Sequence, residues 1–213
     1  MTVKNWARVL WYQHQIIVNK QLLVCLGLVL LLPLMISFRE IQLTQAAMVT
    51  EIYMSLIGFI LIGTVNYPES DRDFSSLLNI KSLSLGKIWM LRVFEEMLIT
   101  IFFMLVWVIF LHHFNHQILI PVFVLGGVST AFLWGAIASS IAIITRSMYT
   151  GILGALVTFF YIIFGMDKQL TFYPLGLLIN PNQTRIMTII VLVGSVGLLS
   201  AALVYNYQRG PEM

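Results

Sequence analysis

Long apolar stretches recur along this chain and constrain its fold more than any other feature. Runs such as CLGLVLLLPLMI and LVTFFYIIF are unbroken and do not alternate with polar residues, as the strands of a membrane β-barrel would. A helix needs roughly 17 to 25 apolar residues to cross the hydrocarbon core of a bilayer. Stretches of about this length lie at 22–38, 46–65, 94–111, 118–144, 148–164 and 186–205. We therefore expect an all-α membrane protein, with six transmembrane helices in a single domain over residues 1–213.

The scarcity of charge agrees with this expectation. Charged residues make up only 10% of the chain and hydrophobic residues 59%, which is too apolar a balance for a soluble domain of this size. If the N-terminus is cytoplasmic, six spans place the C-terminus in the cytoplasm as well. Nine Lys and Arg residues then lie inside, and three lie outside: Arg39, Lys168 and Arg185. Because basic loops stay in the cytoplasm, this asymmetry predicts that both termini are cytoplasmic.

The segment before the first apolar stretch has a different character. At 100° per residue over residues 3–19, Trp6 and Leu10 fall on one face of a helix, and Lys4 and Arg8 fall on the other. A helix with basic and apolar faces separated in this way lies in the headgroup layer of a membrane. We expect an N-terminal amphipathic interfacial helix here. The alternative is an exposed amphipathic helix that packs on another part of the protein.

A polar island, NYPESDRDFSSLLNIKSLSLGKIWMLR at 66–92, separates the second and third apolar stretches and holds seven charged side chains. Ser70 and Asp73 have the spacing of a capping box, with Asp in place of Glu or Gln, so a helix is expected to begin near Asp71. One side of this helix carries the apolar residues Phe74, Leu77 and Leu78. These side chains could dock on a soluble partner; alternatively, they could lie against the bilayer.

Three segments resemble the permease subunit of type 2 ABC transporters, an exporter-like family. In that family the loop after the second span has a Glu, a short Leu-rich helix, a Pro-x-Ser turn and a Lys. Here Glu69, two leucines, KSLS and Arg92 stand in those places, with Lys81 where the proline would be. WGAIASSIAIITRSMYTG at 134–151 is similar to the small-residue fourth span and the tight inner loop. YPLGLLINPNQTR at 173–185 is similar to the outer segment with an Asn-Pro pair.

The resemblance implies that residues 69–80 form a coupling helix that docks in a cytoplasmic ABC ATPase. The residues implied in this docking are polar and apolar side chains of the island and one arginine of the inner loop: Glu69, Asp71, Arg72, Asp73, Phe74, Leu77, Leu78 and Arg146. Residues 166–184 are too apolar for a free loop and too broken by Pro and Gly for a spanning helix, so we expect them to dip into the outer leaflet as a re-entrant segment, which is tolerated only where protein shields the backbone. The resemblance implies that this segment caps the outer exit of the substrate path. We expect the protein to lie in a bacterial plasma membrane.

The chain lacks the motor that such a transporter needs. ATP hydrolysis requires a phosphate-binding G-x-x-x-x-G-K-[ST], but the pair Gly86-Lys87 is followed by Ile and has no glycine five residues earlier. We therefore expect no enzymatic activity and no cofactor in this chain, with ATP and Mg²⁺ bound by a partner ATPase. Six spans would be half of a transport unit, so the other expected partner is a second copy or a related permease. No nucleic-acid partner is expected.

Two carboxylate positions are candidate sites within the apolar stretches. Glu51 is a candidate for lining a substrate path, although its side chain could instead reach the outer surface. Glu95 and Glu96 follow Arg92 at helical spacing, so they could form local ion pairs or an inner gate. Paired glutamates are also a feature of CAAX-type intramembrane proteases, but the arginine expected after such a pair is missing from MLITIFFMLV.

Histidines and rows of small residues each leave two interpretations open. His112, His113 and His116 could bind a metal ion or form a polar outer hairpin, and we expect the hairpin and no metal site. Small residues repeat every four positions, in Ala131, Gly135 and Ser139, in Ala138 and Ala142, in Gly151 and Ala155, and in Gly197 and Ala201. These rows let helices approach closely, either between two subunits or within one.

These observations favour the permease subunit of an ATP-driven exporter of an amphipathic, lipid-like, peptide or drug substrate. The alternatives are a membrane-embedded metal-dependent enzyme that resembles an intramembrane protease and a membrane scaffold or immunity protein without transport activity. The sequence does not distinguish these substrates, because an apolar passage between helices has no readable motif.

Overall fold

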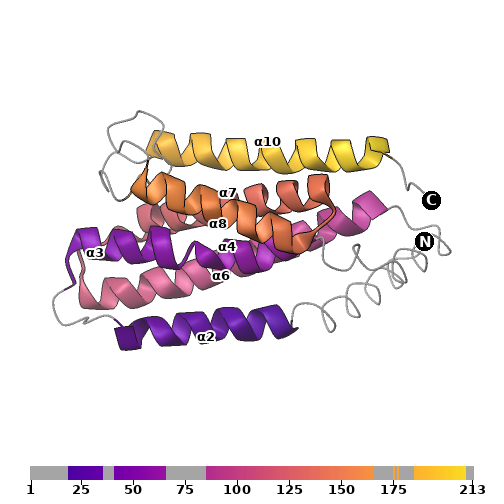
Figure 1. Ribbon diagram of the computed structural model, residues 1–213. Coiled ribbons are helices and arrows are strands. Elements are labelled where there is room, and N and C mark those ends of the chain that lie inside the picture. The colour runs from indigo at the N-terminus through magenta and orange to yellow at the C-terminus, as the bar shows by residue number, and fades with distance from the viewer. Residues whose placement is uncertain are drawn as a thin grey trace. The chain divides into compact units, whose positions relative to one another are not determined.

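The computed structural model describes residues 19–35, 41–65, 85–165, 175, 177 and 185–209, which form helices and the turns between them (Figure 1). The all-helical expectation is confirmed for these residues. Three helices are long and apolar enough to cross a membrane: Leu43–Thr64, Trp89–Phe114 and Ile120–Thr145. Shorter apolar helices cover Gln21–Leu32, Met148–Phe164 and Thr188–Ala202. The six-span count stays a prediction, and the interfacial helix at 3–19 and the coupling helix at 69–80 lie outside the described residues.

The chain divides into two compact units, Met1–Arg39 and Glu40–Met213. The described part of the first unit is α2, Asn19–Met35, at the place of the first apolar stretch. Large apolar side chains of α2 are exposed: Leu23, Val24, Leu26, Leu30 and Leu31. These residues share one side of the helix, whereas Cys25 and Leu32 on the other side are buried. An apolar exposed side of this kind suits a helix that contacts lipid.

The second apolar stretch folds as one helical rod with two changes of pitch. It begins as α3, Leu43–Met48, and passes into a π-helical turn, η3, Val49–Tyr53. It continues as α4, Leu56–Leu61, and ends in a 3₁₀ turn, η4, Ile62–Thr64. Hydroxyl groups along the rod donate to carbonyls of their own helix, which competes with the regular ladder. These bonds run from Thr50 to Ala46, from Ser55 to Ile52, and from Thr64 to Ile60 and Leu61.

The third and fourth stretches form a helical hairpin, α6, Leu85–Phe114, and α7, Ile120–Thr145. Pro121 lies in the first turn of α7, where its missing N–H leaves no bond unmade. Arg146 ends α7 in the left-handed region, with φ 54°, and its backbone N–H donates to Ala142. Ser147 then caps the next helix by accepting from the Thr150 N–H at 3.3 Å.

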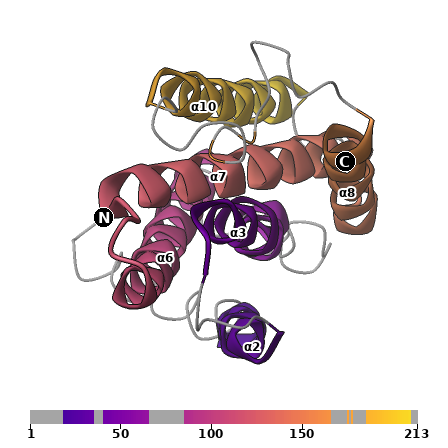
Figure 2. The ribbon, with the colours of Figure 1, turned by 90° about the vertical axis from the view of Figure 1, so that its left-hand side faces the viewer.

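The remaining helices are α8, Met148–Phe164, and α10, Arg185–Arg209. Within the second unit α7 is central, since it contacts η3, α4, η4, α6, α8 and α10. Figure 2 shows α7 between α10 on one side and α3 and α6 on the other. The core of this unit therefore lies along α7, whose small residues let its neighbours approach.

Small residues of α7 pack inside this unit. A Cβ added to Gly58 would lie 1.9 Å from the Ala131 carbonyl oxygen, and one added to Gly151 would lie 2.4 Å from the Ala138 carbonyl oxygen. The contacts of α7 with α4 and α8 are thus direct contacts between backbones. Gly197 on α10 has no described neighbour within 4 Å of such a Cβ. Internal packing accordingly explains the rows on α7 and α8 but not the row on α10.

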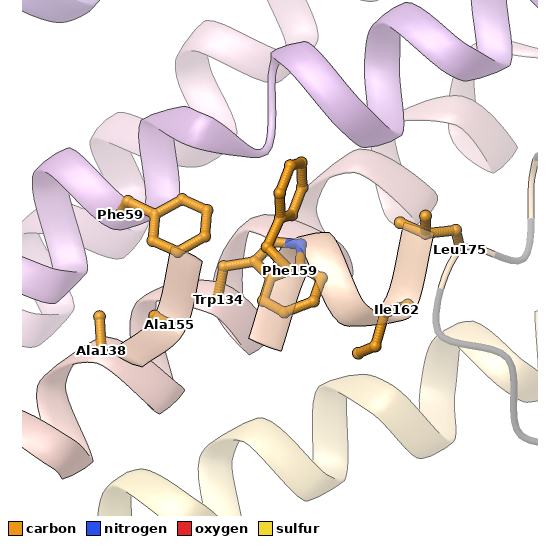
Figure 3. Close-up of a cluster of buried hydrophobic side chains, with 7 residues drawn as sticks. All are labelled: Phe59, Trp134, Ala138, Ala155, Phe159, Ile162 and Leu175. Atoms are coloured by element: carbon orange, nitrogen blue, oxygen red, sulfur yellow. The ribbon is translucent and has the colours of Figure 1, made fainter. Parts of the chain in front are cut away.

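Aromatic side chains fill the space between α4, α7 and α8 (Figure 3). Phe59 stacks on Trp134, with ring centroids 5.8 Å apart, and Phe159 meets Trp134 edge-on at 5.1 Å. Leu175 lies at the edge of this cluster, beside Ile162. The opposite faces of α6 and α8 expose large apolar side chains, including Phe94, Phe102, Val157 and Phe164. Such surfaces suit a membrane protein, whose outer faces contact lipid.

Candidate functional site

Glu51 lies inside the helical bundle, although it belongs to one of the three apolar spans. Its side chain is 1% exposed. The alternative sequence interpretation, in which this side chain reaches the surface, is therefore wrong for this structure. Its Oε1 accepts a hydrogen bond from the backbone N–H of Leu177 at 2.8 Å. A carboxyl group in apolar surroundings needs such partners, because burial removes it from water. We call Glu51 and its contacts with Leu177 the Glu51 site.

The π-helical turn is what distinguishes the local backbone at Glu51. The Met54 N–H donates to the Val49 carbonyl at 3.0 Å, five residues back, instead of four. One extra residue in a turn changes the faces on which the following side chains lie, and such turns are frequent at functional sites. Thr50 donates from its hydroxyl to the Ala46 carbonyl at 2.8 Å and thereby stays with the helix backbone. The turn thus places the one carboxylate of this rod in the interior.

Leu177 is held by its side chain as well as by its backbone. It is 0% exposed, and its Cδ1 lies where a Cβ on Gly126 would be only 2.4 Å away. Gly126 therefore leaves a notch in α7 that a branched aliphatic side chain fills. Two residues earlier, Leu175 is also 0% exposed and joins the aromatic cluster. Of the expected re-entrant segment at 166–184, these are the two residues that the structure describes.

Trp134, in the aromatic cluster, carries a second polar group in this region. The side chain is 0% exposed, and its indole Nε1 has no hydrogen-bond partner among the described residues. A buried indole N–H normally finds an acceptor, so its lack of one is unusual. The region around Leu175 and Leu177 thus contains the Glu51 carboxyl, which accepts a hydrogen bond, and the Trp134 indole N–H, which has no described acceptor.

A separate polar group of residues lies on α6, at the end of the bundle that adjoins the polar island. Arg92 is 5% exposed, and its Nη1 donates to the Val65 carbonyl at 3.5 Å. Val65 is the residue directly before the polar island, so Arg92 links both ends of that segment. Glu96 is 4% exposed and its Oε2 has no hydrogen-bond partner among the described residues. Local pairing with Arg92 therefore does not satisfy this oxygen of Glu96, while Glu95 is half-buried.

The histidines lie at the opposite end of α6 and form part of its turn to α7. The Nδ1 of His112 is 2.9 Å from the Ile118 carbonyl, and the rings of His112 and His116 lie 5.2 Å apart. No group of three potential metal ligands occurs among the residues that the structure describes. Glu96 and His112 are sixteen positions apart on α6, which corresponds to about 24 Å along the helix. One metal ion could not bind both groups on α6, as an intramembrane metalloprotease would require.

Of the predicted docking residues, the structure describes only Arg146. Arg146 is exposed at the turn between α7 and α8. Gly63, near the end of the second span, lies against Ala138, since an added Cβ would be 3.0 Å from that side chain. The end of η4 and the last turns of α7 are therefore neighbours. The island residues are outside the described part of the chain: Glu69, Asp71, Arg72, Asp73, Phe74, Leu77 and Leu78.

Sequence reasoning singled out Glu51, Arg92 and Glu96, but it did not foresee their surroundings. The Gly126 notch and the Trp134 indole without a described acceptor were missed, because glycine is frequent in membrane helices and tryptophan is frequent at their ends. An apolar sequence interrupted by a Glu is the one signal that pointed to this region. No protein-family model, curated protein or solved structure matches this chain.

Proposed function

We propose that this chain is the permease subunit of an ATP-driven ABC transporter that exports an amphipathic, lipid-like, peptide or drug substrate. ATP hydrolysis would occur on separate cytoplasmic ATPase subunits, which would hold ATP and Mg²⁺. A second copy or a related permease would complete the transport unit in a bacterial plasma membrane. Six spans with cytoplasmic termini belong to the same proposal. It starts from the resemblance of three sequence segments and from the independent distribution of basic residues.

The observation that best supports it is the contact of Arg92 with Val65. ATP-driven closure of two ATPase subunits can move membrane helices only through a stiff connection. The polar island begins after Val65 and leads into α6, and Arg92 bonds the two flanking helices directly at that point. A force on the island would therefore act on both helices together. A loop joined loosely to its helices would absorb such a force.

The packing of the bundle would carry this movement further from the inner end. Gly58 on α4 contacts the backbone of α7 at Ala131, and Gly151 on α8 contacts α7 at Ala138. Such close packing leaves little room for one helix to move alone, because packed interiors have few voids and transmit strain. Displacement of α4 and α6 would thus reach α7 and, through it, the Glu51 site near the other end.

The direct test is co-purification of the chain with an ATPase from its own host. Phe74→Asp and Leu77→Asp place a charge on the apolar side of the expected island helix. We expect both variants to lose the bound ATPase and nucleotide-dependent substrate movement. Ser76→Asp is the matched control, because it adds the same charge on another side of that helix, and it should retain the ATPase. Undisturbed transport by the Phe74→Asp and Leu77→Asp variants would refute the proposal.

A further inference from the structure

Leu177 shows what kind of group the Glu51 site accepts. Two features of this residue are recognised together: a backbone N–H by the Glu51 carboxyl at 2.8 Å, and a branched side chain by the notch at Gly126. Both are general features of a peptide and neither depends on the neighbouring sequence. The site therefore has the complementarity of a peptide-binding site that this chain fills with its own residue.

A further polar group in this region extends this complementarity to a short peptide segment. Leu175 packs in the cluster that contains Trp134, and it is two residues from Leu177. Two extended residues span at most about 7 Å, so both ends of this short stretch lie in one region. The indole N–H of Trp134 is buried and has no described acceptor, and a peptide carbonyl would supply one. Each residue of a peptide carries one backbone donor and one backbone acceptor, so a short apolar segment can supply both a donor to Glu51 and an acceptor to Trp134.

We propose that the Glu51 site binds an apolar peptide segment with a branched aliphatic side chain, and that Leu177 occupies this place in the present structure. The inference deepens the proposed function by naming the substrate class, and it rests on that function. An acyl chain has no N–H and would leave the Glu51 carboxyl without this donor in an apolar site. A phosphate or carboxylate headgroup would bring further oxygen acceptors against the carboxyl. Peptides are thus favoured over the lipid-like substrates.

The test uses the full-length chain in nanodiscs of zwitterionic lipid, without any ATPase. The probe is a radiolabelled leucine tetrapeptide with blocked ends and a photoreactive group, and its twin carries N-methyl groups that remove the N–H donors. Leu177→Ala empties the notch, so we expect photolabelling to saturate at about tenfold lower peptide concentration than with the unsubstituted chain. The N-methylated twin should label Leu177→Ala no more than it labels the unsubstituted chain.

Substitutions at Glu51 separate recognition of the N–H from a general effect on packing. In the Leu177→Ala background, Glu51→Leu removes the acceptor and should weaken labelling about tenfold. Glu51→Gln keeps an acceptor oxygen and should restore most of this loss. Ser195→Ala, which alters a buried hydroxyl that bonds within α10, is the matched control and should leave labelling unchanged. If Glu51→Leu does not fold, the comparison of the two peptides on Leu177→Ala alone decides the matter.

Equal labelling by the N-methylated twin would overturn the inference, as would stronger competition by palmitate or phosphatidic acid than by unlabelled peptide. These results would leave the proposed permease function standing. Peptide labelling as expected, in a chain that never co-purifies with an ATPase, would instead support the site and refute the function. The two proposals can therefore fail separately.

Discussion

Gly58→Ala tests whether backbone contact between α4 and α7 holds the bundle together. The added methyl group would lie 1.9 Å from the Ala131 carbonyl oxygen, 2.6 Å from its carbonyl carbon and 2.8 Å from its Cα. Carbon atoms in contact normally lie about 3.5 Å apart, so the two helices must separate locally by about 1 Å or more. The obstacle is backbone, which cannot turn aside as a side chain can.

The expected cost follows from two opposing effects. Overpacking of this kind typically costs about 1–3 kcal/mol, while alanine in a helix is favoured over glycine by about 1 kcal/mol. Because the overlap is with backbone that cannot turn aside, the upper end of the overpacking range applies, and we expect the free energy of unfolding to fall by about 2 kcal/mol. For a chain of this size, that corresponds to a fall in Tm of about 4–8 °C. Fluorescence-detected size-exclusion chromatography after heating in mild detergent measures the change.

Gly197→Ala is the matched control on α10. An added Cβ there has no described neighbour within 4 Å, so only the helix preference acts, and Tm should stay unchanged or rise slightly. Equal falls in Tm for the two variants would show that glycine itself, and not the Ala131 contact, matters. A stable Gly58→Ala variant with wild-type Tm would refute the close packing of α4 on α7.

Three further predictions concern the contact of Arg92 with Val65, the aromatic cluster and the turn between α6 and α7. Arg92→Met keeps the apolar stem but removes the hydrogen bond to the Val65 carbonyl. We expect the free energy of unfolding to fall by about 1 kcal/mol and the coupling between ATPase activity and transport to weaken. Arg92→Lys should restore part of both losses. Phe159→Ala should cost about 3 kcal/mol, whereas Phe164→Ala, at a side chain that is 80% exposed, should change Tm by less than the error of the thermal assay. His112→Ala should lower Tm slightly by removing a bond of the hairpin, and EDTA should leave the Tm of the unsubstituted chain unchanged; a fall in Tm with EDTA would contradict the assignment of this turn.

The length of an apolar stretch determined where the main helices lie. The stretch at 148–164 coincides with α8, Met148–Phe164, and the stretch at 118–144 lies within two residues of α7, Ile120–Thr145. Hydrophobic length is a property of consecutive residues, so it can be read without knowledge of their neighbours in space. The helix expected at 94–111 is longer in the structure, Leu85–Phe114, because the helix continues through the amphipathic residues on either side. Polarity alone does not end a helix.

The function of individual polar and small residues depended on the tertiary structure. Glu51 was visible in the sequence as a carboxylate in an apolar stretch, but its partner Leu177 is 126 positions away. Sequence spacing also left open whether Gly135 and Gly197 contact another subunit or the same one. Gly135 packs against Ile62, and Gly197 faces no described neighbour. Local sequence thus determined the helices of this protein. Only their packing decided which polar groups meet, because a contact depends on distance in space between residues that are far apart in the chain.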